Sequence, residues 1–188
     1  NDIVALIKRA KTDDKIKGIF LDLSSVRAGM ATIEEIRNAL IDFKTSKKFI
    51  VSYGEVYSQG AYYLASTADE IYLNPIGEMD FKGFSAQIMF FKGMLDKLEI
   101  QPQVFKHGRF KSAVEPFVLD KMSADNREQT RKYVTSLWGH VISGLSESRN
   151  IPTDSLTSMA NGILIQSADD AVKYGMVDGL KYRDEILD

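Results

Sequence analysis

The sequence predicts an α/β fold with a parallel sheet, because short apolar runs alternate along it with helical patterns. The clearest runs, residues 17–23 and 49–53, are almost continuously apolar and are bounded by turn residues. Such runs are typical of parallel strands that are buried on both faces. The alternation favours stacked strand-helix units over a β-sandwich or a helical bundle.

Three helices are expected in the first third of the chain. Residues 3–10 carry apolar side chains at helical spacing. A second helix should begin near Thr32, because threonine is a common N-cap and Glu35 follows three residues later. A third, apolar helix is expected over residues 59–65, after the second strand.

The middle of the chain continues the alternation. Residues 71–73 read as a strand that Pro75 ends, and residues 81–86 as a further extended piece. A helix should follow around Phe91 to Leu98, and residues 103–106 read as the next strand.

The last third is expected to be mainly helical. A long helix should run from about residue 123 to Arg149, since apolar side chains recur along it at helical spacing. Pro152 should open a shorter helix, and residues 163–165 read as a strand. A final helix over residues 168–175 should end at its glycine.

The composition is that of an ordinary globular chain. Of 188 residues, 44% are hydrophobic and 27% are charged, and the formal net charge is -2. The length argues for a single domain over residues 1–188, and the near balance of charge gives no reason to expect nucleic acid as a partner. With no cysteine and two histidines, the sequence offers no basis for a metal site, and we expect no cofactor.

The sequence gives no sign of a membrane segment. No stretch approaches the roughly 18 consecutive apolar residues of a membrane helix, and the first residues lack the features of an export signal. The abrupt start in a helical pattern, without an initiator methionine, reads as a piece of a longer parent chain. We therefore expect any membrane anchor to lie outside these residues.

Three residues are candidates for nucleophile or base chemistry. Ser58 lies between a strand and a helix, where a serine can be a nucleophile, but helix N-caps are often serine and the G-x-S-x-G pattern is absent. We interpret Ser58 as a cap. His107 follows a strand, yet no carboxylate partner is visible for it. Lys111 stands among small and apolar residues, which could keep its amine neutral and basic, or it could be an ordinary surface lysine.

Three short segments carry a family resemblance. They read YSQGAYYLAS from Tyr57, KSAVEPF from Lys111 and GMVDG from Gly175. Together they resemble the amino-terminal half of the long, two-repeat form of bacterial signal peptide peptidase A, also called protease IV. The resemblance runs from about Ile16 to the carboxyl end, and KSAVEPF is its most specific part.

The resemblance implies a fold and a mechanism. The family is related to Clp proteases and crotonases, which implies a superhelix of repeated strand-strand-helix turns. Its members are serine proteases with a Ser/Lys dyad, and the dyad lysine falls on Lys111. The serine does not carry over, because the position three residues before the Tyr-Tyr pair holds Gln59. The loop at residues 24–29 also lacks the Pro-Gly-Gly of active repeats.

These implications give a specific functional hypothesis. Residues 1–188 form the lysine-bearing amino-terminal repeat, truncated at its start and inactive alone, while a second repeat of the same parent chain supplies the serine. The substrates would be signal peptides and other apolar peptides at the periplasmic face of the bacterial cytoplasmic membrane, and a homo-oligomer is expected. The alternatives are a crotonase-like acyl-CoA enzyme and a non-catalytic repeat that helps to assemble a ring.

Overall fold

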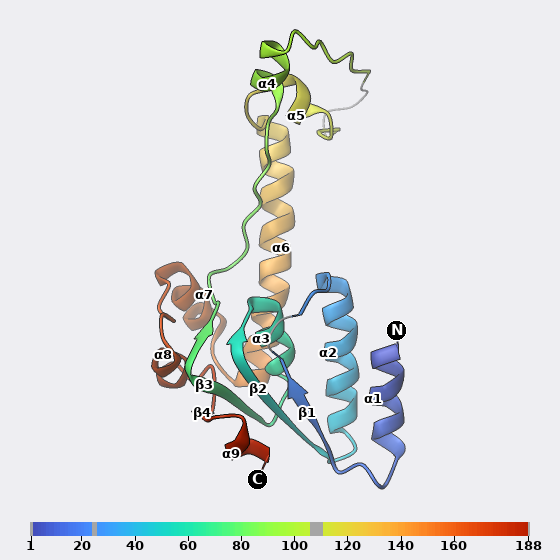
Figure 1. Cartoon of the computed structure of the whole chain (residues 1–188), viewed down its shortest axis with the longest axis vertical. Coiled ribbons are helices and arrows are strands. Elements are labelled where there is room, and N and C mark those ends of the chain that lie inside the picture. Colours follow the sequence, from blue (N-terminus) through green and yellow to red (C-terminus); the bar gives the residue numbers. More distant parts are fainter. Residues whose placement is uncertain (1, 24–25, 106–110, 188) are drawn as a thin grey trace. The chain divides into compact units, whose positions relative to one another are not determined.

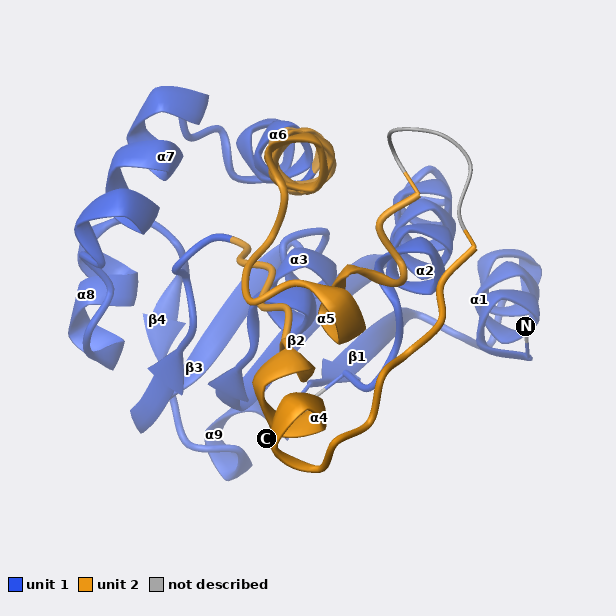
Figure 2. Cartoon of the chain, turned by 90° about the horizontal axis from the view of Figure 1, so that it is seen from above, with its two compact units in different colours: residues 1–83, 141–188 blue, residues 84–140 orange. Residues whose placement is uncertain are grey.

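The chain folds into two compact units, seen in a computed structural model that describes residues 2–23, 26–105 and 111–187. Unit 1 comprises residues 1–83 and 141–188, and unit 2 comprises residues 84–140 (Figure 2). The long helix α6, Ala124–Arg149, begins in unit 2 and ends in unit 1. Within the described residues, no helix has both the length and the apolar character that a membrane crossing requires.

Unit 1 is built on a parallel sheet with the strand order β1-β2-β3-β4 (Figure 1). Its strands are β1 (Gly18–Asp22), β2 (Phe49–Tyr57), β3 (Glu70–Met79) and β4 (Gly179–Leu180). In the register of the sheet, Ile19 pairs with Ile50, and Tyr53 pairs with Tyr72. The prediction of an α/β fold with a parallel sheet is therefore confirmed.

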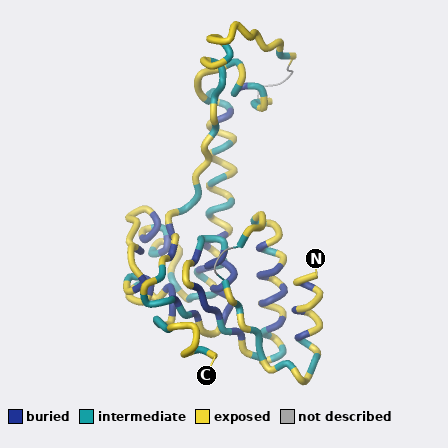
Figure 3. The backbone as a smooth tube through the Cα atoms, viewed as in Figure 1, coloured by how far each residue is buried: buried dark blue, intermediate teal, exposed yellow. Residues whose placement is uncertain are grey.

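Unit 1 also contains helices, and all but the last of them contribute buried side chains to its core. They are α1 (Asp2–Thr12), α2 (Met30–Lys44), α3 (Gln59–Ala65), α7 (Thr153–Gly162), α8 (Ala168–Lys173) and α9 (Asp184–Leu187). Helix α2 contacts both α1 and α3, and α8 packs on β3 and β4. The buried segments in Figure 3 are concentrated in these elements.

Unit 2 contains α4 (Lys92–Lys97), α5 (Glu115–Val118) and the first part of α6. Its aromatic contacts pair Phe84 with Trp138 and Phe91 with Phe117, at ring-centroid distances of 5.6 and 6.0 Å. None of these rings is buried. Unit 2 thus differs from unit 1 in how its apolar side chains are covered.

Two aspartates fix the starts of neighbouring strands in the same way. The carboxylate of Asp69 accepts a hydrogen bond from the Ile50 amide at 2.8 Å, and the carboxylate of Asp178 accepts one from the Ile71 amide at 2.7 Å. Each aspartate amide also donates to the carbonyl of the same isoleucine at 2.8 Å. Asp178 forms an additional ion pair with Arg149 at 2.9 Å. The aspartate in GMVDG therefore has a structural role.

The structure corrects two predicted element boundaries. Helix α2 begins at Met30 with Gly29 as its N-cap, so Thr32 is not the cap. Strand β3 continues through Pro75, because its pairing with β2 is irregular there and jumps from Leu73 to Glu78. A proline is tolerated where the ladder needs no amide hydrogen bond.

Three strand predictions were wrong in part or whole. Residues 163–165 form no strand, since Ile163 adopts a left-handed conformation with φ 49° and ends α7. Residues 103–105 are also not a strand, and residue 106 lies outside the described residues. Strand β1 is not buried on both faces, because none of its residues is fully buried and Phe20 is 36% exposed.

Candidate functional site

Lys111 lies at the start of a short, well-fixed turn in unit 2. The amide of Glu115 donates to the carbonyl of Ser112 at 2.9 Å, and this bond closes the turn from which α5 begins. Pro116 occupies the first turn of α5, where its missing amide hydrogen is tolerated. The side chain of Lys111 is exposed, whereas Ser112 is half-buried. The KSAVEPF segment therefore presents its lysine to the surface.

The exposure of Lys111 limits what this chain can do alone. A lysine acts as a base only when its amine is neutral, and the neutral form is favoured by desolvation or by a nearby cation. A base role for Lys111 therefore requires a covering surface, and the role stays a prediction.

A buried carboxylate anchors the segment that follows Lys111. Glu115 is 2% exposed. It accepts hydrogen bonds from the Ser123 amide at 3.1 Å, from the Ser123 hydroxyl at 2.5 Å and from the Asn126 side-chain amide at 2.9 Å. Ser123 and Asn126 stand at the start of α6, where the helix dipole favours a negative charge. Our sequence analysis missed this cluster, because Glu115 belongs to α5 whereas Ser123 and Asn126 stand at the start of α6, and only tertiary structure brings them together.

The start of α3 holds the two residues at which a nucleophile was considered. The Ser58 hydroxyl accepts a hydrogen bond from the Ala61 amide at 3.3 Å, so Ser58 is the N-cap of α3, as predicted. The side chain of Gln59 binds the backbone of residues 82–83, where the first segment of unit 1 ends. Its side-chain carbonyl accepts from the amides of Lys82 and Gly83 at 3.2 and 3.0 Å, and its amide donates to the Gly83 carbonyl at 3.3 Å. Gln59 is therefore a structural residue at this position.

The candidate His107 lies outside the described residues, as do Ser24 and Ser25 of the loop at residues 24–29. Lys111 belongs to unit 2, whereas Ser58 and Gln59 belong to unit 1.

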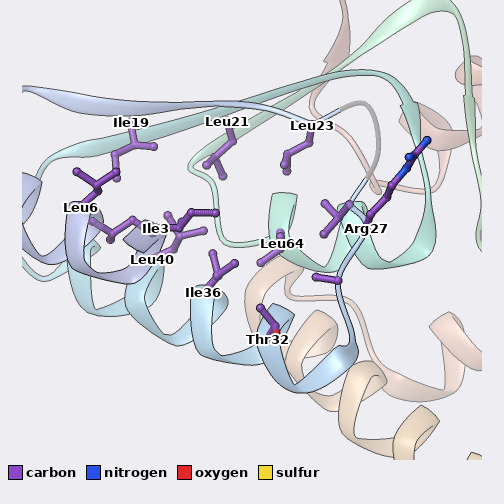
Figure 4. Close-up of a pocket in the computed structure, with 13 residues that line it drawn as sticks. Ile3, Leu6, Ile19, Leu21, Leu23, Arg27, Thr32, Ile36, Leu40 and Leu64 are labelled. Carbon is purple, nitrogen blue, oxygen red and sulfur yellow. The ribbon is translucent and has the colours of Figure 1, made fainter. Parts of the chain in front are cut away.

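An apolar cavity of about 490 Å³ lies in unit 1 (Figure 4). Helices α1, α2 and α3 and strand β1 all contribute to its lining. Ile19 and Leu21 of β1 face Leu6 of α1 and Leu40 of α2 across it (Figure 4). Leu6 is 64% exposed, so the apolar lining reaches the protein surface. This cavity can accept apolar side chains but offers few polar groups for chemistry.

Buried tyrosines surround the sheet of unit 1 and are not candidates for acid-base chemistry near neutral pH. Burial raises the pKa of Tyr57 and of Tyr62. Burial, together with a hydrogen bond to Glu34 at 2.9 Å, raises the pKa of Tyr63 to about 12. The Tyr62 hydroxyl donates to the carbonyl of Met176 at 2.7 Å. These hydroxyls stay protonated and serve as hydrogen-bond donors in the core.

A buried cation in unit 1 was also missed by our sequence analysis. Arg37 is 3% exposed and donates to the carbonyls of Tyr63 and Gly144, at 2.6 and 2.7 Å. It also donates to the hydroxyls of Ser66 and Ser148, at 2.7 and 2.5 Å. Burial lowers the pKa of Arg37, but an arginine remains charged in proteins. Arg37 therefore ties α2, α3 and the end of α6 together.

Comparison with known proteins places the chain in a family. Residues 42–188 match peptidase family S49. The chain is 42% identical over 166 residues to Protease 4 of Haemophilus influenzae, and 40% identical over 179 residues to Protease 4 of Salmonella typhi. It is 27% identical over 181 residues to "Serine protease SPPA, chloroplastic" of Arabidopsis thaliana. The resemblance to protease IV is therefore confirmed.

The chain is much shorter than these relatives. The alignments cover 88%, 93% and 95% of this chain, but only 27%, 29% and 26% of the three relatives, in the same order. The chain thus spans less than a third of the length of each. Because the family match covers most of its residues, the chain belongs to peptidase family S49.

Proposed function

We propose that this chain supplies the general-base lysine of a Ser/Lys-dyad serine protease, and that this lysine is Lys111. The observation that carries the proposal is the fixed turn from Ser112 to Glu115, which presents the lysine of KSAVEPF at the surface. Membership of a peptidase family supports a proteolytic function for the parent protein. The whole protein would contain a second repeat that supplies the nucleophilic serine.

In this mechanism Lys111 transfers protons while the serine forms the covalent bond. The neutral lysine amine takes the hydroxyl proton as the serine oxygen attacks the peptide carbonyl carbon. The resulting lysine ammonium gives this proton to the leaving amine as the peptide C–N bond breaks. A water molecule then attacks the acyl-enzyme, with Lys111 as its base, and the serine oxygen leaves and regains a proton.

Two features support the division of the active site between repeats. Gln59, which stands where the resemblance expects the serine, is engaged by backbone groups of Lys82 and Gly83. Lys111 is exposed and needs a covering surface to become neutral. A second repeat would provide both the serine and this cover.

The proposed substrates are cleaved signal peptides and other extended apolar peptides. The outer strand β1 can offer main-chain hydrogen bonds to an extended peptide, a mode of recognition with little sequence preference. The apolar cavity beside β1 can receive leucine-like side chains. A membrane-anchored parent on the periplasmic side of the bacterial cytoplasmic membrane would meet such peptides.

The architecture proposed for the parent follows the same resemblance. Each repeat would form a Clp protease/crotonase-like superhelix of strand-strand-helix turns, and the repeats would associate as a homo-oligomer. The parallel sheet of unit 1 supports the first part of this proposal.

The decisive experiment is a lysine substitution in the full-length protein. Lys111→Ala should lower peptide turnover by about 10³-fold or more, since the serine loses its base. The matched control is Lys121→Ala, which removes another exposed lysine of unit 2 and should leave turnover unchanged. Full turnover in Lys111→Ala would contradict the proposal. A folded Lys111→Ala variant that also fails to oligomerise would favour a non-catalytic assembly role.

A second experiment tests the division of the site. The 188-residue chain alone should hydrolyse no peptide or ester substrate, because it holds only the base. Hydrolysis that Ser58→Ala abolishes would instead identify a nucleophile within this chain.

A further inference from the structure

The two buried side chains among the described residues of unit 2 are both polar. They are Glu115 and Asn126, which are 2% and 6% exposed. The apolar side chains of unit 2 remain exposed or half-buried. A carboxylate loses hydration when it is buried, and apolar residues usually stabilise such a position as well or better. The buried carboxyl group in unit 2 therefore calls for a reason other than the stability of a core.

The hydrogen bonds of Glu115 join two segments of unit 2. Its carboxylate accepts from the amide and the hydroxyl of Ser123 and from the side chain of Asn126. The Ser123 hydroxyl in turn accepts from the Asn126 amide at 3.2 Å, and so it caps α6. Asn126 also accepts from the Thr130 hydroxyl at 3.4 Å. The start of α5 is thereby fixed to the first turn of a helix of 26 residues.

The backbone of Glu115 is bonded on both sides as well. Its amide donates to Ser112 at 2.9 Å, and its carbonyl accepts from Leu119 at 2.8 Å. Lys111 directly precedes Ser112 in the sequence. The chain from Ser112 to the Glu115 anchor is therefore a single closed turn, and Lys111 directly precedes it.

We propose that Glu115 is a positioning residue, whose carboxylate holds the turn that sets the place of the Lys111 amine. This inference rests on the proposed function of Lys111. Proton transfer requires the donor and acceptor within hydrogen-bond reach, and a displacement of about 1 Å can lower a rate about 10²-fold. In this role Glu115 acts through the turn and takes no direct part in the proton transfer.

The test compares variants of the full-length protein. Glu115→Gln keeps the shape but turns one acceptor oxygen into a donor that faces other donors. We expect kcat to fall about 10- to 100-fold while KM changes less than about threefold, because positioning of the base affects the chemical step. The matched control is Glu128→Gln, which removes a half-exposed carboxylate from α6 and should leave kcat unchanged.

A reciprocal exchange separates positioning from general damage. In the double variant E115Q/N126D, the donor and acceptor change sides, so the hydrogen bond between the two side chains can form again. The double variant should regain part of the lost kcat, because the bond between the two side chains returns while the Ser123 amide stays without its acceptor. If instead it is as slow as the single variant while both remain folded by circular dichroism, the inference is wrong.

A milder variant covers the case in which Glu115→Gln does not fold. Ser123→Ala removes only the hydroxyl that bonds to Glu115, and it should lower kcat about three- to tenfold without raising KM. Unchanged kcat in Ser123→Ala would overturn the inference. The proposed function fails separately, if Lys111→Ala keeps its turnover. Loss of turnover in Lys111→Ala together with normal kcat in Glu115→Gln would reject only the role of Glu115.

Discussion

Unit 1 and unit 2 are stabilised in different ways. All the buried apolar side chains among the described residues belong to unit 1, including the fully buried Leu40, Phe43 and Ile50. In unit 2, side chains such as Met94 and Leu98 are 54% and 60% exposed. Hydrophobic burial is the main favourable contribution to folding, so unit 1 can be stable on its own contacts.

Under the proposed function, stability and catalysis would be divided between the two units. Unit 1 provides a packed sheet with its helices, and unit 2 provides the turn that carries Lys111. Unit 2, whose described apolar side chains are all exposed or half-buried, gains order from the continuous helix α6 and from the Glu115 cluster. The exposed apolar side chains of unit 2 fit the proposal that a second repeat covers this part of the protein.

The largest expected effect on stability is the loss of a buried aromatic ring from unit 1, compared with the loss of an exposed ring from unit 2. Phe43→Ala should destabilise the chain by about 3–5 kcal/mol, because Phe43 is 0% exposed and its loss leaves a cavity. The matched variant Phe105→Ala, at a position 96% exposed, should change stability by less than about 0.5 kcal/mol. Urea unfolding followed by circular dichroism measures both. Equal losses would show that the two units do not differ in this way.

Much of unit 1 could be predicted from the sequence. The apolar runs at residues 17–23 and 49–53 correctly predicted β1 and β2, since short apolar runs between turn residues are typical of parallel strands. Helix α6 ends at Arg149 as expected, but its apolar stripe is buried only from Val141 onward. Periodicity shows which residues share a helix face, and it does not show whether anything covers that face.

The remaining errors have physical causes. Residues 103–105 are apolar enough for a strand, but a strand forms only where another strand pairs with it. Pro75 is tolerated in β3 because of an irregularity in strand pairing that no local pattern reveals. The same limit applies to the site. Lys111 could be singled out from its neighbours, while the hydrogen bonds of Glu115 depend on tertiary structure.

The second largest effect should come from the buried cation. Arg37→Met keeps much of the side-chain volume but leaves the carbonyls of Tyr63 and Gly144 without this donor, so we expect a loss of about 3 kcal/mol. Arg131→Met, at an exposed position of α6 in unit 2, should change stability by less than about 0.5 kcal/mol. Urea unfolding of both variants tests this. A small effect of Arg37→Met would mean that water or rearrangement satisfies the freed acceptors.

A smaller effect concerns alkaline pH and should arise in unit 1. The pKa of Tyr63 is raised to about 12 by burial and by its hydrogen bond to Glu34, whereas an unfolded tyrosine titrates near pH 10. Its contribution to stability is therefore fully present below about pH 10 and is lost as the pH rises toward 12. Tyr63→Phe should flatten the fall in unfolding free energy over this range.

The control for this prediction is Tyr133→Phe, which removes a hydroxyl in unit 2 from a side chain that is 68% exposed. In this variant the unfolding free energy should depend on pH as it does in the unsubstituted chain, measured by urea unfolding at several pH values from 9 upward. If Tyr63→Phe also keeps it, other groups cause the alkaline loss of stability.

The smallest effect should come from Ser58, and it separates the structural role of unit 1 from catalysis. Ser58 caps α3 through the Ala61 amide, so Ser58→Ala should lower the unfolding free energy by about 1 kcal/mol. Ser58→Asp should retain the cap, because aspartate accepts the same hydrogen bond. In the full-length protein both variants should keep turnover within about twofold, since a cap does not touch the reacting atoms. A folded Ser58→Ala variant without turnover would make Ser58 the nucleophile, and the active site would then not need a second repeat.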